Sequence, residues 1–347
     1  MPLPRRALLI GALPWAACLP LRPSGAQAAE GAEAKRLQLF GPWNGVAGLA
    51  VSPDGGNLAA LSLQTVRVWD VKERAEHFNR PWTGSGLPGA TPLAFSPDGK
   101  LLIQGSEAYE HATRALRVKL DRSSDPERER FEAGGVAVSP DGKLLATYGG
   151  TLYHFQLKLW DLESGKWLRT LVPWAAGACY LHSAGFSADG ARIAADVNGS
   201  VRIWEVATGK LLSTLPGPGG LTLDRVAYSP DGKLLAATGY EVDGQRAPTR
   251  RVLRIWDAGT GSIRRQVELG PYVSTPGQIS LAFSPDGRLL GVSNGRVRFF
   301  RPDTGAAAGE LPENLIATRI VFFPNSPRRL AVGQSDGQVS VWSVPED

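Results

Sequence analysis

The chain has 347 residues, of which 43% are hydrophobic and 20% are charged, and its formal net charge at pH 7 is +5. The 38 basic and 33 acidic residues are spread along the chain without a block of like charge, so the composition argues against a nucleic-acid-binding surface. The two cysteines are Cys18 and Cys179, and Cys18 lies in a segment that we expect to be removed, so no intramolecular disulfide is predicted.

The first 28 residues have the pattern of an export signal. Arg5 and Arg6 precede an apolar run over residues 7–21, and small residues follow around Ala26 and Ala28. We expect cleavage after Ala28, which leaves a mature domain of residues 29–347 in the periplasm or outside the cell. The apolar run is interrupted by prolines and is shorter than the roughly 20 residues that cross a bilayer, so no membrane span is predicted. Sec export, twin-arginine export and, as a minor alternative, lipidation of Cys18 remain open.

A repeated turn dominates the rest of the sequence. Six copies of Ser-Pro-Asp-Gly, one of them with Ala in place of Pro, lie at residues 52–55, 96–99, 139–142, 187–190, 229–232 and 284–287, and an altered seventh copy lies at residues 324–327. Pro presets φ, Asp bonds to nearby backbone amides and Gly accepts a positive φ, so each turn closes a β-hairpin between apolar strands. The spacing of roughly 40–55 residues is typical of a propeller blade, and seven repeats predict an all-β, seven-bladed β-propeller of four-stranded blades.

A third strand in several repeats ends in an aromatic residue followed by an acid. These pairs are Trp69-Asp70, Trp160-Asp161, Trp204-Glu205 and Trp256-Asp257, while repeats 6 and 7 have Phe300-Arg301 and Trp342-Ser343 and repeat 2 offers only residues 116–119. The pattern resembles the WD40-repeat family over essentially the whole mature sequence, and the resemblance implies that these residues are structural. The Gly-His pair usual in that family is absent, so packing between blades must replace its side-chain network.

Ring closure is also predicted from the two ends of the repeat region. The last blade has no fourth strand after Trp342, whereas a spare apolar strand over residues 36–40 precedes the first hairpin. We expect this N-terminal strand to complete blade 7 and so remove an open sheet edge.

One face of the propeller is the predicted binding face. In the family arrangement the Ser-Pro-Asp-Gly turns lie on one face, and the second-to-third-strand loops and the loops between blades lie on the other. Tight hairpins are expected at residues 198–199, 294–295 and 336–337, but longer connections at residues 106–113, 149–155 and 239–251 in blades 2, 3 and 5. Longer loops on a rigid ring are suited to recognition, although neutral insertion is the alternative.

Aromatic residues that follow proline occur before several blades, at Pro42-Trp43, Pro81-Trp82, Pro173-Trp174 and Pro271-Tyr272. They are interpreted either as packing between blades or as an aromatic collar for a peptide or sugar at the channel mouth. Together with the long connections they supply the candidate partner-binding residues, which are Trp43, Trp82, Tyr109, Tyr153, Trp174, Tyr240, Arg246 and Tyr272.

Catalytic chemistry has little support in the sequence. The four histidines, His77, His111, His154 and His182, show no metal-ligand spacing, and no haem, phosphate-loop or nucleophile motif occurs, so no catalytic residue, metal or cofactor is predicted. The leading hypothesis is a monomeric, non-enzymatic scaffold that binds a protein or peptide. The alternatives are a lactonase-like hydrolase at the channel mouth, built from Asp224, Arg225, His182, Gln278 and Arg319, and a sensor or assembly subunit.

Overall fold

The structure is a computed structural model that describes residues 37–39, 45–62, 65–81, 92–127, 133–151, 154–173, 180–217, 223–245, 247–272, 279–312 and 315–344. The predicted signal peptide, residues 1–28, lies outside the described residues. A single compact unit spans Ala34–Asp347. Within the described ranges, no helix has the length and apolar character needed to cross a membrane.

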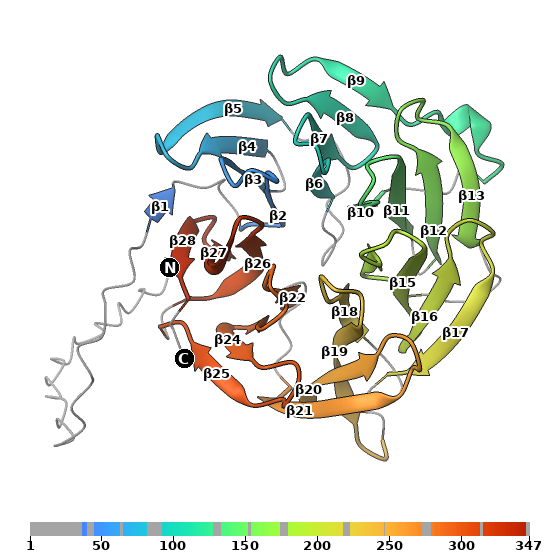
Figure 1. Cartoon of the computed structure of the whole chain (residues 1–347), viewed down its shortest axis with the longest axis vertical. Coiled ribbons are helices and arrows are strands. Elements are labelled where there is room, and N and C mark those ends of the chain that lie inside the picture. The colour runs from blue at the N-terminus through green and yellow to red at the C-terminus, as the bar shows by residue number, and fades with distance from the viewer. Residues whose placement is uncertain are drawn as a thin grey trace, which may run out of the picture. The chain divides into compact units, whose positions relative to one another are not determined.

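Seven four-stranded antiparallel sheets form the blades, and the first strand of each blade lies nearest the centre of the ring (Figure 1). Blade 1 contains β2 (Gly48–Val51), β3 (Asn57–Leu61), β4 (Thr65–Asp70) and β5 (Ala75–Pro81), and blade 2 contains β6 (Leu93–Phe95), β7 (Leu101–Gln104), β8 (Glu107–Glu110) and β9 (Leu116–Lys119). Blade 3 contains β10 (Gly135–Val138), β11 (Leu144–Thr151), β12 (His154–Asp161) and β13 (Trp167–Val172). Blade 4 contains β14 (Ala184–Phe186), β15 (Arg192–Val197), β16 (Ser200–Glu205) and β17 (Leu211–Pro216).

The remaining blades follow the same order. Blade 5 contains β18 (Leu223–Tyr228), β19 (Leu234–Val242), β20 (Pro248–Asp257) and β21 (Ile263–Pro271), and blade 6 contains β22 (Ile279–Phe283), β23 (Leu290–Asn294), β24 (Arg296–Phe300) and β25 (Ala307–Glu310). Blade 7 contains β26 (Ala317–Phe323), β27 (Ser326–Gln334), β28 (Val339–Ser343) and β1 (Leu37–Leu39). The predicted seven-bladed propeller is therefore confirmed.

The predicted closure is confirmed as well. Strand β1 pairs antiparallel with β28, with Leu37 opposite Val341 and Leu39 opposite Val339, so the N-terminal strand is the outer strand of blade 7. A second contact joins the same two blades at the repeated turns, where Asn325 Nδ2 donates to the carbonyl oxygen of Asp54 at 2.7 Å. The first and last blades are thus tied together by backbone and side-chain hydrogen bonds.

The repeated turn owes its shape to one serine and one aspartate. In blade 1, Ser52 Oγ donates to Asp54 Oδ1 at 2.5 Å and accepts the N–H of Asn57 at 2.8 Å, while Asp54 Oδ1 accepts the N–H of Gly56 at 2.9 Å. Gly55 has φ +70°, which disfavours residues with a Cβ. The same bonds recur in the five other copies, whose Ser and Asp are Ser96 and Asp98, Ser139 and Asp141, Ser187 and Asp189, Ser229 and Asp231, and Ser284 and Asp286.

The aromatic residue of each third strand is buried opposite an apolar residue of the second strand. The pairs are Trp69 with Leu58, Tyr109 with Leu102, Trp160 with Leu145, Trp204 with Ile193, Trp256 with Leu235, Phe300 with Leu290 and Trp342 with Leu330. The acid that follows caps the next turn, because Asp70, Asp161 and Asp257 accept the N–H of Glu73, Ser164 and Thr260 at 2.7, 2.8 and 2.9 Å. The hydrophobic clusters lie between neighbouring blades, as Ile203 of blade 4 and Trp256 of blade 5 do in one cluster.

Blade 2 corrects one expectation. Residues 116–119 form the fourth strand, β9, and the third strand is β8, where Tyr109-Glu110 occupies the place of the aromatic-acid pair. A two-residue turn joins β7 to β8, so residues 106–113 are not a long connection on the predicted binding face. The connections of blades 3 and 5 are long because their strands continue as paired ribbons, with Thr151 opposite His154 and Val242 opposite Pro248.

Candidate functional site at the channel mouth

A histidine and an aspartate of blade 4 meet where the innermost strands begin. His182 precedes β14, and Asp196 lies near the end of β15. The Asp196 carboxylate accepts the backbone N–H groups of His182 at 2.9 Å and Ser183 at 2.6 Å, and its Oδ2 lies 3.0 Å from His182 Nδ1. Burial lowers the pKa of His182, but the hydrogen bond and negative charge of Asp196 outweigh burial and raise that pKa above its ordinary value. The imidazole is therefore held in one orientation by a carboxylate that is only 2% exposed.

Blade 5 adds an ion pair beside this histidine. Arg251 of β20 donates from Nη1 to Asp224 Oδ2 of β18 at 2.6 Å. The neighbouring Arg225 donates from Nη1 to the carbonyl oxygen of His182 at 3.0 Å and to that of Asp224 at 3.1 Å, and so links blade 5 to blade 4. Burial raises the pKa of Asp224, and the charges of Arg251 and Arg225 oppose that rise. Arginines are rarely this buried without partners, and here carboxylate and carbonyl oxygens supply them.

Blade 7 contributes a further buried cation. Arg319 of β26 takes the same position in its innermost strand as Arg225 does in β18, since Arg319 pairs with Gly333 and Arg225 with Thr238. Arg319 is 4% exposed and donates from Nη1 to the carbonyl oxygen of Thr318 at 2.7 Å. Burial and the positive charge of Arg225 lower its pKa well below the ordinary value. Three arginines against two aspartates give this mouth an excess of positive charge, which favours an acidic or acceptor-rich ligand.

Aromatic rings border the charged groups. The rings of Tyr240 and Tyr272 meet edge to face with centroids 4.9 Å apart, and the Arg251 guanidinium lies 4.8 Å from the Tyr272 centroid. On the blade 4 side, Tyr180 is 39% exposed and lies parallel to the His182 ring at 6.4 Å. These rings give the mouth flat contact surfaces beside its hydrogen-bond donors.

The candidate residues predicted from sequence have three different outcomes. Tyr240 and Tyr272 come together beside Arg251. Tyr109 instead lies in β8 and is 2% exposed, because its ring fills the position of the repeat tryptophan. Its hydroxyl donates to Glu107, Arg80 lies over its ring at 3.9 Å, and burial together with the Glu107 hydrogen bond raises its pKa to about 12. The remaining five, Trp43, Trp82, Tyr153, Trp174 and Arg246, lie outside the described residues.

The scattered residues named for the hydrolase alternative do converge. His182, Asp224, Arg225 and Arg319 all belong to the cluster, whereas Gln278 lies outside the described residues. Sequence reasoning missed Asp196 and Tyr180, although Asp196 stands at a position where the other second strands carry neutral residues. Within the part of the protein that the structure describes, no three His, Cys, Asp or Glu residues are placed to hold a metal ion.

Comparison with known proteins supports a WD40-like repeat. Residues 35–70 match the family model described as WD domain, G-beta repeat. They span β1 and β2–β4, so the matching repeat includes the outer strand of blade 7 and the three inner strands of blade 1. One sequence repeat therefore bridges the point at which the ring closes.

Relatives match over part of their length. The chain is 27% identical over 218 residues to Telomerase protein component 1 of Rattus norvegicus, which covers 61% of this chain and 7% of that protein. It is 28% identical over 155 residues to Protein transport protein sec31 of Aspergillus fumigatus, which covers 42% of this chain and 11% of that protein. The match thus involves a small part of each relative.

A solved structure shares the fold. The hydrazine synthase of Kuenenia stuttgartiensis matches with a TM-score of 0.71 and 17% sequence identity, over 88% of this chain and 97% of that one. At this identity the likeness concerns the fold alone. The protein is therefore a β-propeller similar to the WD40-repeat proteins, because its first repeat matches their family model, its third strands end in aromatic-acid pairs and its sheets form seven blades.

Proposed function

We propose that the mature protein is a non-enzymatic scaffold that works in the periplasm or outside the cell and binds a protein or peptide segment at the channel mouth. The export-signal pattern of residues 1–28 supports the location, and the WD40-like fold supports a role in protein interaction. The observation that carries the proposal is the cluster of Arg251, Asp224 and His182 beside the rings of Tyr240 and Tyr272.

A peptide segment suits this mouth for two physical reasons. Backbone carbonyl groups and acidic side chains are acceptors, and they complement the positive charge that the three arginines leave in excess. The polar side chains are already held by hydrogen bonds within the protein, so little conformational entropy is lost when a ligand binds. Tyrosine rings at such a surface contribute contact area at a low entropic cost.

The test is capture of a partner by the full mature protein from the envelope fraction of the cells that make it. The Tyr240→Ala/Tyr272→Ala variant should bind the captured protein about 10- to 100-fold more weakly, as expected for loss of aromatic anchors. The matched control is Lys100→Ala/Lys143→Ala, which changes exposed residues beside the repeated turns on the other face. Equal binding by the tyrosine variant, at unchanged melting temperature, would place the partner elsewhere.

The hydrolase alternative is favoured by one feature, the His182 and Asp196 pair. A carboxylate on Nδ1 orients the imidazole so that Nε2 can accept a proton from water, which is the arrangement of a general base. Under this alternative His182→Gln abolishes turnover of an ester or lactone. Under the scaffold proposal the wild-type protein turns over neither an ester nor a lactone, but it still captures its partner.

A further inference from the structure

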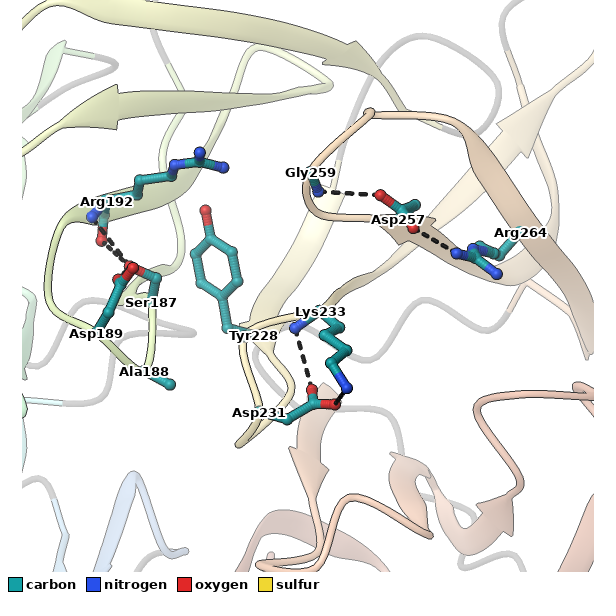
Figure 2. Close-up of a pocket in the computed structure, with 11 residues that line it drawn as sticks. Ser187, Ala188, Asp189, Arg192, Tyr228, Asp231, Lys233, Asp257, Gly259 and Arg264 are labelled. Carbon is teal, nitrogen blue, oxygen red and sulfur yellow. Dashed lines mark hydrogen bonds and ion pairs between the residues drawn. The ribbon is translucent and has the colours of Figure 1, made fainter.

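A pocket lies between blades 4 and 5 on the face opposite the channel mouth. It has a volume of about 630 Å³ and opens beside the repeated turns of these blades, as Figure 2 shows. Arg192 and Ala188 line it from blade 4, and Tyr228, Lys233 and Arg264 line it from blade 5. The pocket is therefore distinct from the channel mouth, where the strands of the same two blades have their other ends.

Departures from the repeat converge on this pocket. Ala188 is the one residue among the six repeated turns that replaces proline. Gly232 therefore faces the small Ala188 side chain, where the equivalent glycines 99, 142, 190 and 287 face a proline ring of the preceding blade. Tyr228, the residue before the blade 5 turn, corresponds to valine or phenylalanine in the other blades. Arg192, five residues after Ser187, corresponds to asparagine or leucine in the other five copies, whereas blade 7, whose turn is altered, also carries an arginine there, Arg329.

The other blades thus show which residue types are sufficient for folding at each position of the repeat. Valine, phenylalanine and leucine satisfy the same positions elsewhere in the ring, so neither a hydroxyl nor a guanidinium is needed there for folding. The three departures come from two blades and are up to 40 residues apart in the sequence, yet they line one cavity. Their convergence indicates a binding function for this pocket.

Arg192 and Tyr228, the two polar residues among these departures, are both hydrogen-bond donors, and their side chains lie close together. Figure 2 shows the Tyr228 hydroxyl pointing toward the Arg192 side chain. The Tyr228 hydroxyl is buried and has no hydrogen-bond partner among the described residues. A buried hydroxyl left unpaired costs about 1–3 kcal/mol, so it favours a ligand or a water that supplies an acceptor. Arg192 Nη1 donates to the carbonyl oxygen of Ala258 at 3.3 Å, which leaves other N–H groups of the guanidinium to meet a ligand.

The charges around the pocket favour a ligand that carries a single negative charge. Arg264 forms an ion pair with Asp257, and Lys233 lies 3.6 Å from Asp231, so these two cations already have carboxylate partners. In the described ranges Arg192 forms no ion pair within 4.0 Å. Burial raises the pKa of the Tyr228 hydroxyl to about 12, while the positive charge of Arg192 lowers that pKa and the negative charge of Asp189 raises it. Arg192 balances a single negative charge, and Asp189 repels a phosphate dianion more strongly than it repels a carboxylate.

We propose that this pocket binds a carboxylate group of a peptide segment, held by the Arg192 guanidinium and the Tyr228 hydroxyl. The hydroxyl is buried and Arg192 is exposed, so access of the carboxylate to the hydroxyl requires a side-chain movement, which the proposal assigns to Arg192. The carboxylate comes from an acidic side chain or from the free C-terminus of a peptide, which share this chemistry. The site goes beyond the channel-mouth function and does not depend on it.

The experiment measures binding of hexapeptide libraries to the full mature protein. Four libraries are compared, which have a central Glu with an amidated C-terminus, a central Gln with an amidated C-terminus, a central Gln with a free C-terminus, and a central phosphoserine with an amidated C-terminus. The variants restore the residues of the other blades, Arg192→Leu and Tyr228→Phe, so they are compatible with the fold. Arg288→Leu is the matched control, because it removes a charge beside the blade 6 turn on the same face.

The wild-type protein should select the Glu library or the free C-terminus library at least tenfold over the neutral library, and which of the two is selected identifies the source of the carboxylate. Arg192→Leu and Tyr228→Phe should each weaken that binding fivefold or more, and Arg288→Leu and Tyr240→Ala/Tyr272→Ala should not. Tyr228→Phe should keep or raise the melting temperature, because it removes the unpaired hydroxyl. Equal binding by Tyr228→Phe would mean that the hydroxyl meets water alone and would overturn the proposal. Selection of the phosphoserine library, or no selection over the neutral library, would overturn it as well.

Discussion

The ion pair between Lys158 and Asp125 gives a sharp test of how blade 3 is held to its neighbour. Lys158 lies in β12, and Asp125 follows the short 3-10 helix η1 (Arg122–Ser124) in the connection between blades 2 and 3. Their side chains are 0% and 1% exposed, and the Lys158 ammonium bonds to Asp125 Oδ2. Asp125 Oδ1 also accepts the N–H of Glu127 at 3.0 Å. The pair therefore fastens the connecting segment to the third strand of blade 3.

Loss of one partner should be far costlier than loss of both. Lys158→Met leaves a buried carboxylate without its cation, and breaking a buried pair in this way costs about 3–5 kcal/mol. With an unfolding entropy of about 2.1 cal/mol/K per residue, a unit of about 310 residues loses about 1.5 °C in Tm per kcal/mol, so a fall of about 5–8 °C is expected. The Lys158→Met/Asp125→Asn double variant retains the acceptor for Glu127 and leaves no buried charge. It should recover most of that loss.

Thermal and urea unfolding of the wild type, both single variants and the double variant would complete a double-mutant cycle. The matched control is Lys166→Met, an exposed lysine of the same blade, which should change Tm little. Additive losses in the double variant, or single variants within about 1 kcal/mol of the wild type, would refute the reasoning that the buried charge carries the cost.

Three further predictions concern the fold. Deletion of residues 29–40 removes β1 and exposes the edge of β28, so the melting temperature should fall by several degrees and aggregation should increase; an unchanged melting curve would contradict closure by this strand. Tyr109→Ala should cost about 3–5 kcal/mol in urea unfolding, as expected for a buried aromatic residue, and a loss below 1 kcal/mol would contradict its place in the core. Hydrogen bonds from Ser139 and from the N–H of Lys143 lower the pKa of Asp141. The stabilisation by the ionised Asp141 is therefore present above about pH 4 and is lost as the pH falls through the lowered pKa. Asp141→Asn should reduce Tm at pH 7 and make Tm depend less on pH between about pH 5 and 2. A variant whose Tm falls as steeply with pH as that of the wild type would contradict this prediction.

The fold could be predicted from sequence because its determinants are local. Ser, Pro, Asp and Gly in four adjacent positions define a turn by their own hydrogen bonds and dihedral preferences, and six such turns, together with an altered seventh, define seven hairpins. Blade 2 departs from the expected strand assignment because its second hairpin is shorter than in the other blades, which brings Tyr109 closer to the turn than a repeat tryptophan would stand. The signal is present in the sequence, since Tyr109-Glu110 is itself an aromatic residue followed by an acid.

The candidate sites are harder to predict because their residues meet only after the ring has formed. Asp196 contacts His182 across the first hairpin of blade 4, but Arg225 and Arg319 come from blades 5 and 7. Charge and periodicity along the sequence do not predict contacts between residues of different blades. A position-by-position comparison of the six repeats that keep the Ser-x-Asp-Gly turn would single out Ala188, Arg192 and Tyr228, since each differs there from the residue that the other copies carry.

Both candidate sites take most of their residues from blades 4 and 5, one on each face, and this placement determines which variants can test them. The core between these blades packs Ile203 against Val226 and Trp256, and all three are buried. A truncation there would loosen the supports of His182 and Arg225 on one face and of Arg192 and Tyr228 on the other, so a binding defect would carry no information about either site. Some variants replace a site residue with the residue that another blade carries at the same position. They avoid this problem, because the replacement already packs at the equivalent position of that other blade. Loss of binding by such a variant at unchanged Tm therefore reports on recognition and not on the junction.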